Sequence, residues 1–404
     1  MAFDGIVISN IVKDMKDKLI GGRILKIQQP EKDELIITIK NYDQYMLFIS
    51  ADASLPLLYL CSAKKEAPLS APNFCMLLRK HIGTARIVDI YQPDFERVVV
   101  FELEHLDEMG DVCRKKLIVE IMGKHSNIIF GNEDDGKIRI IDSIKHVSAA
   151  VSSVREVLPG REYFIPRTIE KYNPLIVTEE EFTEKILSYP GELSKAIYMS
   201  LTGFSPVMAN ELLHRANISS DLNVAETDKN TIPRLYEHLR RMMEEVESGD
   251  YKPCIVYSLS ESDAFGSKKE IPVEFAALDL SLYKDYTGYV VKEYDSISIV
   301  LEYFYAKRNA QGRMKQKSAD IRKLVGNAVE RTVKKYEIQK KQLESTEKRD
   351  KFKLYGELLT TYGYGLDTGS RSVELENFYD GNKIIVPLDP DLSPLENAKR
   401  YFEK

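Results

Sequence analysis

The residues best suited to chemistry in this 404-residue chain are those that could bind phosphate. Residues 201–206, Leu-Thr-Gly-Phe-Ser-Pro, join two apolar helical patterns, and a Gly-x-x-Pro turn of this kind is typical of a helix-hairpin-helix unit. Free amides of such a turn and the N-terminus of the next helix can hold a phosphate oxygen, so Gly203 and Ser205 are phosphate-binding candidates. A plain packing role for the turn is equally compatible with the sequence.

A second candidate for phosphate binding is a basic segment at residues 307–351. It holds 15 Lys and Arg residues against six Asp and Glu, a local charge of +9 that leaves −15 for the rest of a chain whose net charge is −6. By base rate such a run is a solvated helix face, but this imbalance favours contact with an RNA backbone. The candidates named first are Lys307, Arg308, Arg313, Lys315 and Lys317.

Neither a metal centre nor a catalytic group is indicated. The four Cys are scattered and the six His form no zinc-type spacing, so we expect no metal, no cofactor and no disulfide framework. His125 has no nucleophile and orienting group at recognisable spacing, which favours a turn-forming role over catalysis. The N-terminal residues lack a signal-peptide layout and no apolar run is long enough for a membrane span, so a cytoplasmic location is expected.

The elements that must position these residues begin with an α+β region over the first 170 residues. Period-2 alternation predicts strands at 34–40 and 97–104, and shorter strands are expected in six more places. Helical spacing predicts a helix over residues 6–19 that Gly21 and Gly22 end, and another between Pro72 and Gly83. The six further strands are expected near 23–29, 45–50, 86–91, 115–121, 127–130 and 137–141.

Helical patterns dominate after a cluster of Pro, Gly and Asn that ends near residue 174. A β-like stretch follows at 253–294, and then a stretch without proline predicts one helix over 297–362, about 99 Å long at 1.5 Å per residue. Its apolar residues recur every three or four positions, which favours a coiled-coil strand. The predicted domains are 1–174, 175–296 (helix-hairpin-helix with a β-like extension), 297–362 (first coiled-coil helix), 363–392 (small middle unit) and 393–404 (start of a return helix, cut short).

Five segments, taken in chain order, resemble the NFACT family, whose bacterial branch includes the RqcH or fibronectin-binding protein A type of ribosome quality-control factor. The segments are Asp4-Gly5 and residues 21–30, 74–82, 120–127 and 201–206. The resemblance implies a glycosylase-like NFACT-N domain, a helix-hairpin-helix domain and a long coiled-coil arm with a small middle unit. It also implies a C-terminal NFACT-R domain, which we expect to be missing from this chain.

The resemblance further implies a function. Such factors bind the large ribosomal subunit (rRNA) carrying a stalled peptidyl-tRNA and recruit tRNA, alanyl in bacteria, for untemplated C-terminal tailing of the nascent chain. The ribosome makes the peptide bond, so the factor is expected to be a scaffold and not an enzyme. Two alternatives are a cell-surface adhesin with fibronectin as partner and a DNA glycosylase. Such glycosylases use an N-terminal proline, and Ala2 and Phe3 at the start of this chain argue against that activity.

The tRNA-binding residues that the resemblance implies lie in the first domain. The family's early Asp and its Asp-Arg pair fall on Asp4, Glu96 and Arg97, with Glu96 one methylene longer than the usual Asp. The family also uses the block that begins with Glu120, Ile121, Met122 and Gly123 near the anticodon arm. From the residues alone, an ion pair of Arg97 with Glu96 or Glu102 would be the favoured role.

Overall fold

The computed structural model describes residues 3–63, 65–106, 109–166, 170–259 and 270–404, without the side chains of 306–320. Residue contacts divide the chain into two compact units, 1–310 and 311–404. The predicted domain boundaries are a finer division and stay predictions.

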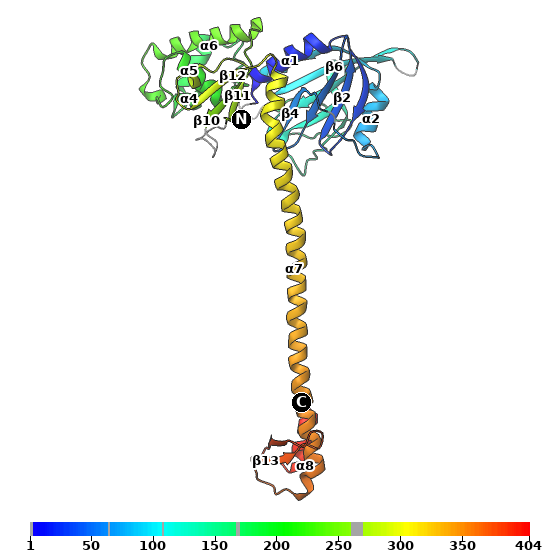
Figure 1. The fold of residues 1–404 in the computed structure, drawn as a ribbon. Helices are drawn as coiled ribbons and strands as arrows, with labels where there is room; N and C mark the ends of the chain where they lie inside the picture. The colour runs from blue at the N-terminus through cyan, green and yellow to red at the C-terminus, as the bar shows by residue number, and fades with distance from the viewer. Residues whose placement is uncertain (1–2, 64, 107–108, 167–169, 260–269) are drawn as a thin grey trace, which may run out of the picture. The chain divides into compact units, whose positions relative to one another are not determined.

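The first unit is built on a nine-stranded antiparallel sheet (Figure 1), which confirms the predicted α+β class. The strand order is β4-β3-β2-β1-β5-β6-β7-β8-β9, so each hairpin extends the sheet by one strand except where β1 pairs with β5. The strands are β1 (Arg23–Gln28), β2 (Glu34–Lys40), β3 (Gln44–Ser50), β4 (Leu57–Leu60), β5 (Arg86–Tyr91), β6 (Val98–Leu106), β7 (Val112–Glu120), β8 (Asn127–Asp134) and β9 (Lys137–Ser143).

Two helices cover one face of this sheet. Helix α1 (Gly5–Leu19) contacts β4, β5 and β6, and α2 (Asn73–Ile82) contacts β1 and β6. Both were predicted from apolar spacing, and their buried residues join the same core as the alternate residues of the strands. On the opposite face of β6–β9 a smaller core is closed by residues from the segment that follows β9, including Val157 and Tyr163.

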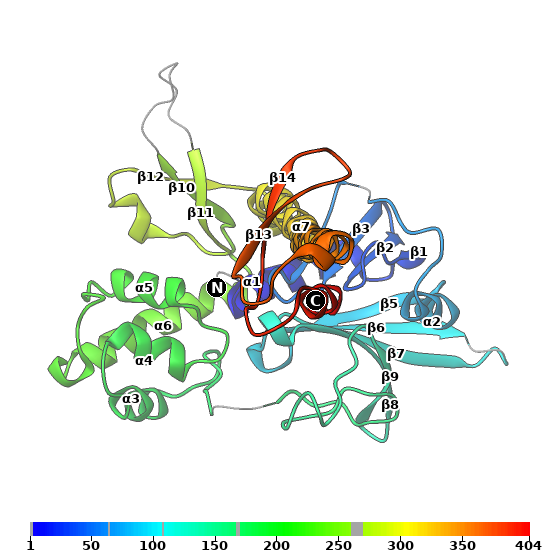
Figure 2. The same cartoon turned by 90° about the horizontal axis from the view of Figure 1, so that it is seen from below.

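A helical group and a small sheet complete the first unit (Figure 2). Their cores are continuous with that of the large sheet, since one cluster of buried residues includes Phe130, Leu212 and Phe275. The elements are α3 (Glu179–Leu187), α4 (Leu193–Ser200), α5 (Pro206–Arg215) and α6 (Thr231–Ser248), followed by β10 (Cys254–Leu259), β11 (Glu270–Ala276) and β12 (Tyr289–Glu293).

Helix α7 (Ile297–Tyr362) has the predicted bounds and is 66 residues long. Between residues 321 and 351 every described side chain is exposed, the apolar ones included. That α7 forms one strand of a coiled coil stays a prediction.

Among the helices in the described part of the chain, none is long and apolar enough to cross a membrane.

Besides the part of α7 that follows residue 310, the second unit holds a two-stranded sheet and a short helix. These are β13 (Ser372–Glu376), β14 (Lys383–Pro387) and α8 (Pro394–Phe402). The start of α8 was predicted from its sequence: Ser393 and Glu396 form a capping box, with proline at the first helical position.

Candidate functional site

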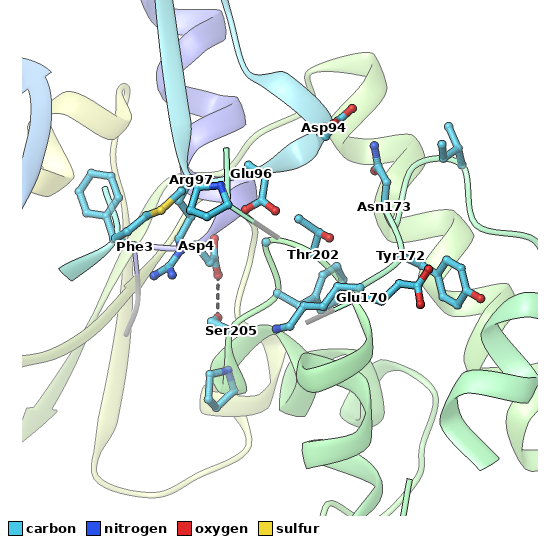
Figure 3. A pocket seen from close by; sticks show the side chains of 17 residues that line it. Phe3, Asp4, Asp94, Glu96, Arg97, Glu170, Tyr172, Asn173, Thr202 and Ser205 are labelled. Carbon is cyan, nitrogen blue, oxygen red and sulfur yellow. Dashed lines mark hydrogen bonds between the residues drawn. The ribbon is translucent and has the colours of Figure 1, made fainter. Parts of the chain in front are cut away.

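Several separate segments of the first unit surround a cavity of about 570 Å³ (Figure 3). They are the start of α1, the β5–β6 loop, the chain around residue 172 and the turn between α4 and α5; a fifth segment, the β7–β8 loop, adds Met122. Segment 170–173 is fixed to that turn because the Tyr172 amide donates to the Ser200 carbonyl and the Thr202 amide to the Tyr172 carbonyl. The lining residues are Phe3, Asp4, Asp94, Glu96, Arg97, Met122, Pro166, Glu170, Lys171, Tyr172, Asn173, Ile176, Thr202, Gly203, Phe204, Ser205 and Pro206.

Asp4 caps the N-terminus of α1 from inside this cavity. Its Oδ1 accepts from the Val7 amide at 2.9 Å, and its Oδ2 accepts from the Ser205 hydroxyl at 2.6 Å. Burial raises the pKa of Asp4 from 3.8 to about 6, although both hydrogen bonds act to lower it. The carboxyl group is therefore more easily protonated than a solvent-exposed one.

The α4–α5 turn places a second helix N-terminus at the same cavity. Ser205 caps α5 by accepting from the Met208 amide at 3.3 Å, and Pro206 is the first residue of the helix. Gly203 has a φ of 70°, a backbone conformation that favours glycine. Because α1 and α5 both begin here, their partial positive charges add to the potential at the cavity.

The β5–β6 loop presents Glu96 and Arg97 through an unusual turn. Asp94 and Phe95 have φ values of 48° and 61°, a strained region for residues other than glycine. The Gln92 side-chain amide donates to the carbonyls of Gly5 (3.0 Å) and Glu96 (2.9 Å), which holds the turn against the start of α1.

Arg97 has no ion pair with Glu96 or Glu102, in contrast to the role that charge spacing alone would favour. Glu102 instead pairs with Lys116 at 3.2 Å. No hydrogen bond joins the Arg97 guanidinium to another residue in the described part of the chain. Burial lowers the pKa of the neighbouring Lys171, and the positive charge of Arg97 lowers it further. The carboxylate of Glu96 acts in the opposite direction and raises the pKa of Lys171.

The predicted block that begins at Glu120 lies mostly inside the protein. Glu120 is in phase with Ile118, so strand alternation directs it to the smaller core, where it has no exposed surface. It accepts hydrogen bonds from Arg155 at 2.5 Å and from Tyr163 at 2.9 Å. In this structure Glu120 therefore supports the segment that follows β9, and its participation in tRNA binding stays a prediction.

The other three residues of that block have different positions. Ile121 and Gly123 are buried, whereas Met122 lines the cavity. The Met122 amide is held by the Ser126 hydroxyl at 2.8 Å. Direct contact with a ligand is thus open to Met122 and not to Ile121 or Gly123 in this arrangement.

Of the predicted phosphate candidates, Gly203 and Ser205 line the cavity together with Asp4, Glu96 and Arg97. The side chains of Lys307, Arg308, Arg313, Lys315 and Lys317 lie outside the described residues. The sequence patterns did not predict Asp94, Glu170, Lys171 or Tyr172, since none of them belongs to a recognisable motif.

The amino-acid sequence matches the family described as NFACT N-terminal and middle domains over residues 4–404. The chain belongs to the NFACT family. Its similarity to the Rqc2 homolog RqcH of Bacillus subtilis is 35% identity over 408 residues, and to the protein of the same description in Streptococcus suis 30% over 406 residues. The chain is covered completely in both matches and spans about two thirds, 66%, of the length of these curated relatives.

Two solved structures illustrate the similarity in fold. The N-terminal part of the fibronectin/fibrinogen-binding protein of Streptococcus suis matches with a TM-score of 0.59 and 28% identity, covering 76% of this chain and 99% of that one. The fibrinogen-binding protein of Staphylococcus aureus matches with a TM-score of 0.58 and 27% identity, with the same coverage. The family match over residues 4–404 and the RqcH relatives confirm the resemblance that the sequence motifs indicate.

Proposed function

We propose that this chain is the tRNA- and ribosome-binding part of a ribosome-associated quality-control factor of the cytoplasm. In this role it binds the large ribosomal subunit with its stalled peptidyl-tRNA and recruits tRNA, alanyl in the bacterial branch, for untemplated C-terminal tailing. It acts as a scaffold for chemistry that the ribosome performs, without enzymatic activity or a cofactor of its own. Membership in the NFACT family and similarity to the RqcH proteins support this proposal.

The observation that carries the proposal is the meeting of the implied tRNA-binding residues at one cavity. Asp4, Glu96 and Arg97 come from distant positions in the chain, yet all three line the same space with Gly203 and Ser205. The guanidinium of Arg97 offers a planar set of donors to a phosphate or a base edge. The carboxylate of Glu96 beside it can accept from an exocyclic amino group of a base, so the cavity offers both a donor and an acceptor to an RNA loop.

Helix α7 supplies a second surface for RNA in this proposal. Its described exposed part, residues 321–351, carries ten Lys and Arg residues against five Asp and Glu. A surplus of this kind binds a phosphate backbone without regard to base sequence, and the binding weakens as salt rises. We assign this surface to contact with rRNA or with the tRNA backbone, and the apolar residues between the charges to the seam of a coiled-coil arm.

The direct test is tRNA affinity of the purified chain at several salt concentrations, with Arg97→Ala as the variant. Loss of one such contact costs about 1–3 kcal/mol, so we expect affinity to fall by roughly 5- to 150-fold. Arg114→Ala is the matched control, since Arg114 is a surface arginine of β7, 70% exposed, that does not line the cavity. Stability should change by less than about 0.5 kcal/mol in both variants.

Two results would contradict the proposal: no salt-sensitive affinity of the unmodified chain for tRNA or large subunits, or equal losses in Arg97→Ala and Arg114→Ala. Binding to fibronectin is the second candidate, and the description of the similar Streptococcus suis protein favours it. Immobilised fibronectin, assayed with the same three proteins, separates the two functions. Saturable binding to fibronectin without tRNA binding would favour the adhesin.

A further inference from the structure

Asp4 precedes a junction at which three distant parts of the backbone are in direct contact. The Gly5 amide donates to the Gly203 carbonyl at 2.7 Å. A Cβ atom on Gly5 would lie 2.8 Å from the Phe95 carbonyl oxygen, and one on Gly203 would lie 2.6 Å from the same atom. No side chain fits at either position, so the two glycines hold the Phe95 carbonyl between the start of α1 and the turn before α5.

The Asp4 carboxylate has little capacity left for a ligand. Each oxygen already accepts from a protein donor, the Val7 amide or the Ser205 hydroxyl, and the residue is only 5% exposed. A carboxylate that contacts RNA needs an oxygen that the RNA can approach and donate a hydrogen bond to. Asp4 instead accepts a hydrogen bond from Ser205, and this bond joins the N-terminal caps of α1 and α5.

We propose that Asp4 and Ser205 are positioning residues that fix the turn carrying Glu96 and Arg97. This inference rests on the proposed function, in which Arg97 contacts tRNA. The hydrogen bond between Asp4 and Ser205 keeps Gly5 and Gly203 pressed against the Phe95 carbonyl. The left-handed conformations of Asp94 and Phe95 are costly, and they persist only while surrounding contacts determine them.

The two possible roles of Asp4, positioning the turn and contacting RNA directly, predict different effects of removing the Ser205 hydroxyl. If Asp4 positions the turn, removing the Ser205 hydroxyl should impair Arg97 even though every charge at the cavity remains. A turn that occupies its binding conformation for only a fifth of the time lowers the apparent affinity about fivefold. If Asp4 instead contacts RNA directly, the Ser205 hydroxyl should have little influence.

The test compares Ser205→Ala, Ser205→Thr, Asp4→Ala and Asp4→Asn in the full chain by two measurements, tRNA affinity and amide hydrogen exchange of residues 93–97. We expect Ser205→Ala to lose about fivefold or more in affinity and to exchange faster, and Ser205→Thr, which keeps the hydroxyl, to recover both. Asp4→Asn should lose less than Asp4→Ala, because an amide can accept from Val7 and donate to Ser205. Thr178→Ala is the matched control, since it removes a capping hydroxyl from α3, away from the cavity.

A double-mutant cycle completes the test. On an Arg97→Ala background, Ser205→Ala should cause almost no further loss of tRNA affinity, because the contact that it positions is already gone. Wild-type affinity and protection in Ser205→Ala would overturn the inference, as would an Asp4→Asn protein that loses as much affinity as Asp4→Ala while residues 93–97 stay protected. Absence of tRNA binding by the unmodified chain would reject the proposed function alone, since hydrogen exchange still decides whether the bond fixes the turn.

Discussion

The raised pKa of Asp4 predicts a pH dependence of stability that a single substitution should remove. The pKa rises from 3.8 to about 6 on folding, because burial opposes the charged form. Between these values the unfolded chain has lost the proton while the folded chain still holds it, so the free energy of unfolding falls as the pH rises. A shift of about two units at 1.36 kcal/mol each gives a loss of about 3 kcal/mol, complete above the folded pKa.

The substitution Asp4→Asn removes this proton and keeps a side chain of the same shape. Other titrating groups contribute equally to both proteins and cancel in the comparison. The free energy of unfolding of Asp4→Asn relative to wild type should therefore rise by about 2 kcal/mol between pH 4 and pH 7.

Urea unfolding of both proteins at steps between pH 4 and 7.5 measures this difference, with pulsed hydrogen exchange of the α1 amides reporting on the unit that contains Asp4. Parallel curves for the two proteins would refute the reasoning. Such a result would mean that the two helix N-termini stabilise the carboxylate as much as burial disfavours it.

Two further predictions concern the supports of the cavity. Arg155→Met removes the ion-pair partner of the fully buried Glu120. Because a buried charge is then left without compensation, the chain should lose about 3–5 kcal/mol of stability. Thermal unfolding measures this loss, and a value below about 1 kcal/mol would contradict the prediction. Gly203→Ala should destabilise the chain by more than Gly160→Ala, which costs about 1–2 kcal/mol. Both glycines have positive φ, but only at Gly203 would the new Cβ meet backbone atoms, so equal losses in urea unfolding would show that the junction can yield.

Local sequence patterns predicted most elements of the fold. Strands β2 and β5 have the predicted bounds, since alternation of Leu35, Ile37 and Ile39 is a signal within a few residues. Strand β4 and the two strands of the second unit were not predicted, because each is only four or five residues long. Short strands gain their stability from pairing with neighbours, which single-segment patterns do not contain.

The site was predictable only in part, because it depends on contacts between remote residues. Asp4 and Arg97 were found through the family resemblance, but the bond from Ser205 to Asp4 spans 201 positions and has no local signal. For Glu120 a signal was present: its phase with Ile118 places it on a covered face. Lys171 had no sequence signal, since an isolated lysine beside a turn is common. Only the fold brings it close enough for the charge of Arg97 to lower its pKa.

The junction of Gly5, Phe95 and Gly203 also has a consequence for the order of folding. Its three parts are far apart in the sequence and are synthesised at different times. The entropy cost of closing such long loops comes before the stabilising contacts can form. The sheet pairs mainly strands that are neighbours in sequence and can assemble early, whereas the turn carrying Arg97 reaches its final conformation only when residue 205 has arrived. During synthesis, therefore, this cavity is completed long after most of the sheet beneath it.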